Sequence, residues 1–232
     1  RRAQRPARPV EHAGVKNAKV IQPCNSREIF DQTATTVFLR AILQMLLGRA
    51  FLLKPKVYIS QQSTVTPFMQ ELWQVCLFQA GAREVTAVHP LLATAAGAGL
   101  PISDSHGYAV AWCADGRLVF GLLAFGHVQY EEEFPFSVSA EKTSGKPTQE
   151  VQQKRESTRE LIQEREFADA WAAFLTRLPA EFRATIAQEG VVVNTAEAEP
   201  SLAVRWSKAA ATPVVIVPPQ TEVLGLQRWA RG

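Results

Sequence analysis

The chain has 232 residues, 47% of them apolar and 20% charged, a balance typical of a globular protein with a substantial buried core. It contains no run of about eighteen apolar residues, which argues against a membrane-spanning helix. The net charge is only +3 and no basic stripe with interleaved aromatic residues occurs, so a nucleic-acid-binding body has no support.

Positive charge is concentrated at the start of the chain, where four arginines lie without an acidic residue among them: Arg1, Arg2, Arg5 and Arg8. Without these four, the chain has 21 basic and 22 acidic residues, so its body is close to neutral. We expect residues 1–14 to form either a solvated, disordered tail or an arm that binds an acidic protein surface or RNA phosphates. An Arg-rich start without methionine indicates the remainder of an organellar transit peptide or a truncated chain. We favour a mitochondrial or other organelle matrix over a bacterial cytoplasm.

The three cysteines, Cys24, Cys76 and Cys113, are far apart and odd in number. No CxxC spacing occurs, so the pattern predicts neither a zinc site nor a disulfide framework. A reducing compartment is the natural inference. We expect all three cysteines to be small core residues.

The first half of the chain alternates predicted helices and strands. Apolar residues four positions apart predict a helix over Gln32–Leu47, and its apolar run Val37–Leu47 predicts that the helix is buried. Thr66 and Pro67 are typical of a helix start, and Gly81 of a helix end. After the first helix, the predicted order is strand, helix, strand and helix, at residues 56–60, 67–80, 84–88 and 90–98. This order predicts a parallel sheet with right-handed crossovers.

From Gly107 the pattern changes to three short strands joined by tight turns, at residues 108–113, 117–125 and 126–131. These strands predict an antiparallel meander. A long amphipathic helix is predicted over residues 150–178, with one apolar face made of Leu161, Ala168, Trp171, Leu175 and Leu178. Two β-branched runs, at residues 190–193 and 213–217, are typical of buried parallel strands, with one helix between them and another over residues 220–230.

The segment Gly81–Gly107, GAREVTAVHPLLATAAGAGLPISDSHG, closely resembles the segment before the second phosphate loop of MreB, the actin-like rod-shape family of bacteria. Weaker likenesses lie at residues 21–23, 190–193 and 213–217. The resemblance implies an α/β fold of ribonuclease H-like (actin-like) architecture, with one complete unit and one N-terminally truncated unit. It implies a partial first subdomain over residues 15–106 and a second over residues 107–232, with a reduced insert at about 132–160.

The positions that carry chemistry in this family are replaced together. The family's second phosphate loop, D-I-G-G-G-T, falls on residues 112–117, and its adenosine loop, T-G-G-G, falls on residues 194–197. The family's catalytic carboxylate falls on His89. The resemblance therefore implies degenerate nucleotide loops at Trp112, Ala114, Asp115, Arg117, Thr195, Ala196 and Glu197. For Arg117 two interpretations stay open, a residual phosphate contact and a solvated turn residue.

The remaining candidate residues are weak. Asp104, Ser105 and His106 have the types of a catalytic triad, but adjacent residues cannot converge on one proton path, so we expect a turn. The acidic run Glu131–Glu133 predicts a solvated strand end or a contact with a basic partner.

Taken with the resemblance, these replacements predict a pseudo-ATPase that needs no cofactor, metal or nucleotide. We expect a non-catalytic structural subunit of a larger assembly, such as an organellar ribosome or respiratory complex, with other protein subunits as partners and RNA as a further partner of the arm. The alternative is an MreB-like cytoskeletal filament protein that still binds nucleotide and acts in cell shape. An enzyme with a re-invented site has no positive residue evidence.

Overall fold

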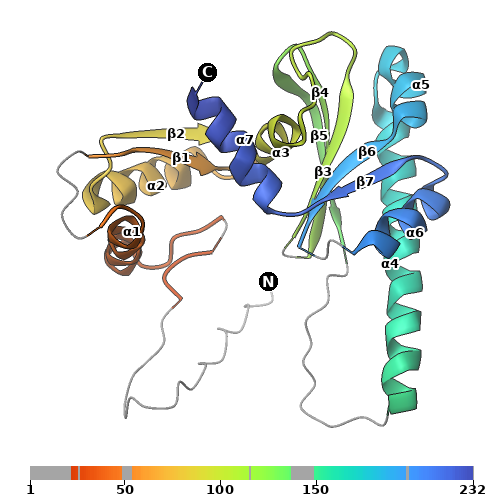
Figure 1. Ribbon diagram of the computed structural model, residues 1–232, viewed down its shortest axis with the longest axis horizontal. Coiled ribbons are helices and arrows are strands. Elements are labelled where there is room, and N and C mark those ends of the chain that lie inside the picture. Colours follow the sequence, from red (N-terminus) through yellow and green to blue (C-terminus); the bar gives the residue numbers. More distant parts are fainter. Residues whose placement is uncertain are drawn as a thin grey trace. The chain divides into compact units, whose positions relative to one another are not determined.

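The chain divides into two units, Arg1–Ala87 and Val88–Gly232, and each is described by itself. The computed structural model describes residues 22–25, 27–48, 54–114, 116–136, 149–196 and 199–231 (Figure 1). The four arginines of the arm lie outside the described residues, as do Asp115 and Glu197. The expected subdomain boundaries stay a prediction. Within the described ranges, no helix is long and apolar enough to cross a membrane.

The first unit contains the predicted elements in the predicted order, α1 (Gln32–Leu47), β1 (Lys56–Ser60), α2 (Pro67–Ala80) and β2 (Glu84–Val88). The Asp31 side chain accepts a hydrogen bond from the Ala34 amide, and the Thr66 side chain accepts one from the Met69 amide. These caps satisfy amides that have no partner inside their own helices, so both helices begin where the sequence predicts. Strands β1 and β2 are hydrogen-bonded neighbours in a two-stranded sheet.

The expectation that α1 is a buried helix is wrong. Its buried residues are Thr35, Thr36 and Leu43, whereas Val37 and Met45 are 61% and 78% exposed. The helix contacts α2 through a mixed apolar and polar face, on which the Thr36 hydroxyl and the Arg40 guanidinium both bond to Gln79. In the described part of the chain, no second layer covers the apolar side chains of Val37 and Met45.

The second unit contains one five-stranded sheet with helices on both faces (Figure 1). Its elements are α3 (Pro90–Ala98), β3 (Tyr108–Ala114), β4 (Arg117–Ala124), β5 (His127–Pro135), α4 (Gln149–Arg177), α5 (Ala180–Glu189), β6 (Val191–Thr195), α6 (Pro200–Ala210), β7 (Val214–Val217) and α7 (Gln220–Arg231). The strand order is β5-β4-β3-β6-β7. The first three strands form the predicted antiparallel meander, and β6 and β7 add to β3 in parallel, also as predicted. Helix α5 was not predicted.

Two apolar clusters hold this sheet between its helices. On one face, Phe120 packs against aromatic residues of α4, including Trp171 and Phe174, with ring centroids 5.4 and 5.2 Å away. On the other face, Leu91 of α3 packs with Val110 and Val119 of the sheet. Alternate residues of β3 and β4 belong to opposite clusters, because successive side chains of a strand point to opposite faces. Helix α3, which we expected in the first subdomain, thus packs against the sheet and α7 of the second unit.

The cysteines agree in part with expectation. Cys76 and Cys113 are buried, whereas Cys24 is half-buried, and none of the three forms a disulfide. Burial raises the pKa of the Cys24 thiol, with the Thr35 side chain acting in the opposite direction. The segment expected to be the reduced insert comprises the end of β5, residues 137–148 outside the described part, and the first turns of α4.

Candidate functional site

The ends of β3 and β6 lie side by side at one edge of the sheet. Trp112 of β3 pairs with Asn194 of β6, and Cys113 pairs with Thr195. Because the two strands are parallel, the loops that follow them leave the sheet at the same edge. The structure therefore brings together most of the positions that the sequence singled out: Trp112, Ala114, Arg117, Thr195 and Ala196.

The Trp112 side chain packs against the apolar core of the second unit. Its neighbour across β4 is Val119, and its indole packs against the apolar cluster that contains Leu91 and Val110. It is thus a half-buried member of the face covered by α3. The turn beyond it is short, because Ala114 pairs directly with Arg117. Gly116 has a φ of 75°, a left-handed conformation that favours glycine.

A buried polar contact joins the end of β6 to the two helices on the same face. The Asn194 side-chain amide donates to the Thr94 hydroxyl of α3 at 3.0 Å and lies 3.5 Å from a Glu222 carboxylate oxygen of α7. Asn194 is 2% exposed and Thr94 is fully buried. Burying these groups is tolerable because each has a hydrogen-bond partner. Polar groups that bind one another therefore join the end of β6 to α3 and α7.

Arg117 is neither a free turn residue nor an open cation. It is the first residue of β4, its side chain is 21% exposed, and its guanidinium lies 3.6 Å from the Glu133 carboxylate of β5. Both residues point to the α3 face of the sheet, as the pairing of Glu133 with Val119 requires. The carboxylate neutralises the positive charge that would attract an anion.

His89 is the N-cap residue of α3, and each of its ring nitrogens faces a neighbouring polar group. Its Nδ1 accepts a hydrogen bond from the Leu91 amide at 3.2 Å, so the ring caps the helix. Its Nε2 lies 3.4 Å from a Glu131 carboxylate oxygen, within ion-pair distance. That nitrogen is buried, and within the described ranges it makes no hydrogen bond of good geometry. His89 therefore acts as a structural residue of the helix start.

The acidic run is an internal ion-pair ladder that sequence reasoning missed. Glu131 faces His89, Glu132 contacts Arg177 of α4, and Glu133 faces Arg117. Glu132 also accepts a hydrogen bond from the Tyr130 hydroxyl at 3.0 Å. The signal was available in the strand alternation, because three consecutive acids on a strand must face two sides of a sheet.

The triad residue types at 104–106 form no triad. His106 Nε2 lies 2.5 Å from a Glu189 carboxylate oxygen, with both side chains roughly half exposed. Its ring centroid is 5.6 Å from that of Tyr108. Partial burial raises the pKa of Tyr108, and the carboxylates of Asp104 and Glu189 add to this effect. In the described residues, no three His, Cys, Asp or Glu side chains converge as metal ligands.

A family model described as MreB/Mbl protein matches residues 12–134, more than half of the chain. MreB5 of Spiroplasma citri, in a crystal structure with AMPPNP, is similar to this chain with a TM-score of 0.73 and 15% identity, over 91% of this chain and 78% of the other. No curated protein matches the chain in sequence.

Two further solved structures are similar in fold. The ethanolamine utilization protein EutJ from Carboxydothermus hydrogenoformans has a TM-score of 0.54 and 16% identity, over 90% of this chain and 77% of the other. The MamK double helical filament has a TM-score of 0.58 and 11% identity, over 87% and 76%. At identities this low, the structural similarity shows a shared actin-like fold. This fold agrees with the α/β architecture predicted from the sequence.

Proposed function

The chain belongs to the MreB/Mbl protein family, and within it we propose a non-catalytic actin-like building block. This protein would be a pseudo-ATPase that serves as a structural subunit of a larger assembly. The observation that carries this proposal is the Trp112 indole, which is packed into the α3-face core beside Asn194 at the end of β3. By its resemblance to the family, this position corresponds to the carboxylate of the second phosphate loop. An indole offers only an N–H donor and cannot orient a metal-bound water.

The polar groups around this position support the same proposal. Glu131 and Glu133 lie on the α3 face of the sheet, and Glu222 reaches toward Asn194 from α7. A triphosphate with its magnesium ion needs backbone amides and positive charge nearby. Here the one arginine of the hairpin is paired with Glu133, and the amide of Leu91 is paired with His89. The residues at this edge therefore do not fit a nucleoside triphosphate.

Ligand binding to the folded state gives a direct test. The unfolding temperature is measured for the chain and for MreB5 of Spiroplasma citri, as positive control, with and without millimolar magnesium-ATP. A ligand at a hundred times its dissociation constant stabilises by about 2.7 kcal/mol, which shifts the unfolding temperature by several degrees. We expect a shift for the control and none for this chain. A shift for this chain would refute the pseudo-ATPase.

The assembly is the second part of the proposal. We expect the native protein to purify with other protein subunits, and mass spectrometry of the purified material identifies them. An organellar complex and an RNA contact rest on the arm alone, through Arg1, Arg2, Arg5 and Arg8. Purification as a single species without companions would count against the scaffold role.

A second candidate function is a nucleotide-binding filament protein. It is favoured by the similarity to MreB5 of Spiroplasma citri, crystallised with AMPPNP, and to the MamK double helical filament. Sedimentation and negative-stain electron microscopy in the presence and absence of magnesium-ATP separate the two functions. Nucleotide-dependent pelleting with visible filaments would establish the filament role and exclude the first proposal.

A further inference from the structure

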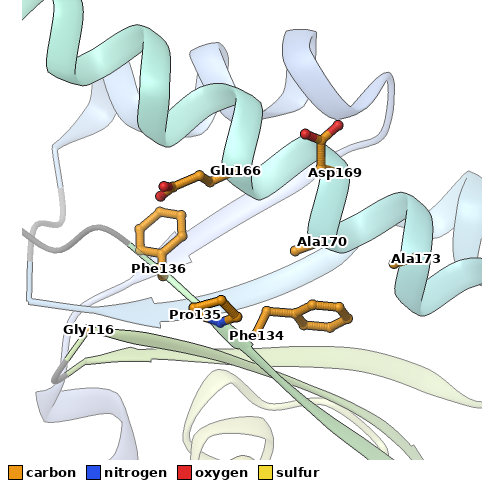
Figure 2. Close-up of a pocket in the computed structure, with 8 residues that line it drawn as sticks. All are labelled: Gly116, Phe134, Pro135, Phe136, Glu166, Asp169, Ala170 and Ala173. Carbon is orange, nitrogen blue, oxygen red and sulfur yellow. The ribbon is translucent and has the colours of Figure 1, made fainter. Parts of the chain in front are cut away.

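A groove of about 430 Å³ lies where the end of β5 meets α4 in the second unit (Figure 2). Phe134 and Phe136 line it, and Glu166 and Asp169 stand on its rim. Both carboxylates are already engaged, and Asp169 lies 3.8 Å from Arg165 of the same helix. Among the residues that line this groove, no charge is left for a ligand.

Two cysteines of the first unit lie beside the first turn of α1. The Cys76 thiol of α2 donates a hydrogen bond to the Gln32 carbonyl oxygen, with 3.8 Å between sulfur and oxygen. The Cys24 side chain is hydrogen-bonded to the Thr35 side chain. Gln32 and Thr35 are three positions apart in α1, so they lie on the same face of the helix. The fold thus brings together two thiols that are 52 positions apart in the sequence.

The backbone before α1 holds Cys24 in this place. The carbonyl oxygen of the preceding Pro23 accepts hydrogen bonds from the Asp31 amide at 3.1 Å and from the Thr35 hydroxyl at 3.2 Å. Cys24 itself forms an isolated antiparallel β-bridge with Ile29. Because these partners all belong to the start of α1 or to the residues just before it, the Cys24 thiol is kept beside the turn that Cys76 contacts.

The two thiols also act on one another. Burial raises the pKa of the Cys24 thiol most, the Thr35 side chain lowers it, and the Cys76 thiol raises it further. A neighbouring thiolate has this effect only at short range, since it repels a second negative charge. Cys76 is fully buried and Cys24 is half-buried, so an oxidant in solution reaches Cys24 first.

We propose that Cys24 and Cys76 form an intramolecular disulfide under oxidising conditions, which fastens the chain before α1 to α2. A low-molecular-weight disulfide such as oxidised glutathione is the oxidant. The Cys24 thiolate attacks one sulfur of this disulfide and releases a first thiol, and the Cys76 thiolate then attacks the Cys24 sulfur and releases a second. One S–S bond replaces two S–H bonds of the protein, and the oxidant takes up the two protons and two electrons. The pair belongs to the first unit and the candidate site to the second, so the disulfide is independent of the proposed function.

Peptide mapping of the full chain tests the pairing. The chain is incubated with oxidised glutathione at about pH 8.5, where more of the thiol is ionised than at neutral pH. Free thiols are then alkylated, and the unreduced protein is digested with trypsin. Cleavage after lysine and arginine leaves the three cysteines on separate peptides, residues 20–27, 57–83 and 84–117. We expect peptide 20–27 joined to peptide 57–83, with Cys113 alkylated. Linkage of Cys24 to Cys113, a glutathione adduct without linkage, or no reaction would overturn the proposal.

Isotope labelling and variants show that the linkage is specific and lies within one chain. Light and isotope-labelled chains are mixed before oxidation, and a linked pair of one light and one labelled peptide would contradict an intramolecular bond. We expect Cys24→Ser and Cys76→Ala each to abolish the linkage. The matched control Cys113→Ala removes a buried cysteine of the second unit and should leave the yield unchanged. An equal loss in this control would overturn the specific pairing.

The disulfide should stabilise the first unit, because it closes a loop of about fifty residues and so constrains the unfolded chain. We expect amides of α1 and α2 to exchange with deuterium at least about tenfold more slowly in the oxidised chain than in the reduced one. Amides of β3 and β4 in the second unit are the internal control and should keep their rates. Reduction with dithiothreitol should restore the original rates. Equal rates in α1 and α2 before and after oxidation would overturn the fastening of these elements.

Discussion

Gly225 of α7 lies directly against Ala93 of α3, so that a Cβ atom on Gly225 would come within 1.7 Å of the Ala93 carbonyl oxygen. The contact has a counterpart along the same pair of helices, because a Cβ on Gly97 would lie 1.8 Å from the Thr221 carbonyl oxygen. Both neighbours are backbone atoms, which cannot rotate away as a flexible side chain would. The two helices thus approach more closely than any residue with a side chain allows.

We expect Gly225→Ala and Gly97→Ala each to lower the free energy of unfolding by about 2–3 kcal/mol, because the added methyl group forces the helices apart. Helix propensity alone predicts the opposite sign, since alanine is favoured over glycine by about 1 kcal/mol in an exposed helix. Urea unfolding followed by tryptophan fluorescence measures the change. The control Ala172→Gly, at an exposed position of α4, should cost only the propensity difference. Stabilisation by either Gly→Ala change would contradict the close contact.

The contact between Asn194 and Thr94 predicts a strongly non-additive pair. Asn194→Leu alone leaves the buried Thr94 hydroxyl without its donor, and should cost about 1–3 kcal/mol. Thr94→Val alone leaves the Asn194 amide with the longer contact to Glu222. In the double variant both polar groups are gone, so we expect its cost to be smaller than the sum of the two single costs. A double-mutant cycle from urea unfolding checks this, and strict additivity would show that the hydrogen bond contributes nothing.

Much of the fold could be predicted because local signals were strong and agreed with one another. Thr66 and Pro67 fix the start of α2, and the two-residue turn before Arg117 fixes the hairpin of β3 and β4. The long helix was predicted, but its buried row was assigned in part to the wrong residues. Leu161 is 66% exposed, whereas Phe167 and Phe174 are fully buried. The difference arose because the apolar row of a helix this long is decided by the strands it meets, and Phe120 of β4 meets Phe167 and Phe174.

The candidate site was predictable in position but not in its contacts. The register of β3 and β6 brings Trp112 beside Asn194, as two loops at one sheet edge require. The partners of Arg117 and His89 depend on the side of the sheet that each glutamate of β5 faces, and the β-bulge between Leu122 and Leu123 changes that register. A bulge has no reliable sequence signal, so the ion-pair ladder could not be derived residue by residue.

The largely buried Glu132 of the ladder should contribute more to the free energy of unfolding than an exposed ion pair does. Glu132 is 12% exposed, contacts Arg177 and accepts the Tyr130 hydroxyl, so Glu132→Gln should destabilise by about 1–2 kcal/mol. The pair of Arg165 and Asp169 on α4 is a matched contrast, because its side chains are 86% and 76% exposed. Asp169→Asn should change stability by less than about 0.5 kcal/mol. Unfolding midpoints in urea measure both, and equal effects would mean that burial of Glu132 adds nothing to its ion pair.

Substitutions of exposed and of buried apolar residues in α1 should have different effects on stability and on solubility. Val37 and Met45 are exposed, whereas Leu43 is 9% exposed and faces the interior of the first unit. Val37→Ser and Met45→Gln exchange residues of similar helix propensity, so we expect the stability of this unit to change by less than about 0.5 kcal/mol. Leu43→Ala should cost about 2–3 kcal/mol, because it leaves a cavity under the helix. Hydrogen exchange of peptides from α1 and α2 reports this unit separately from the rest of the chain. The double surface variant should also reduce concentration-dependent self-association, since it removes two exposed apolar side chains. Loss of protection in the surface variant as large as in Leu43→Ala would mean that another part of the molecule covers this face.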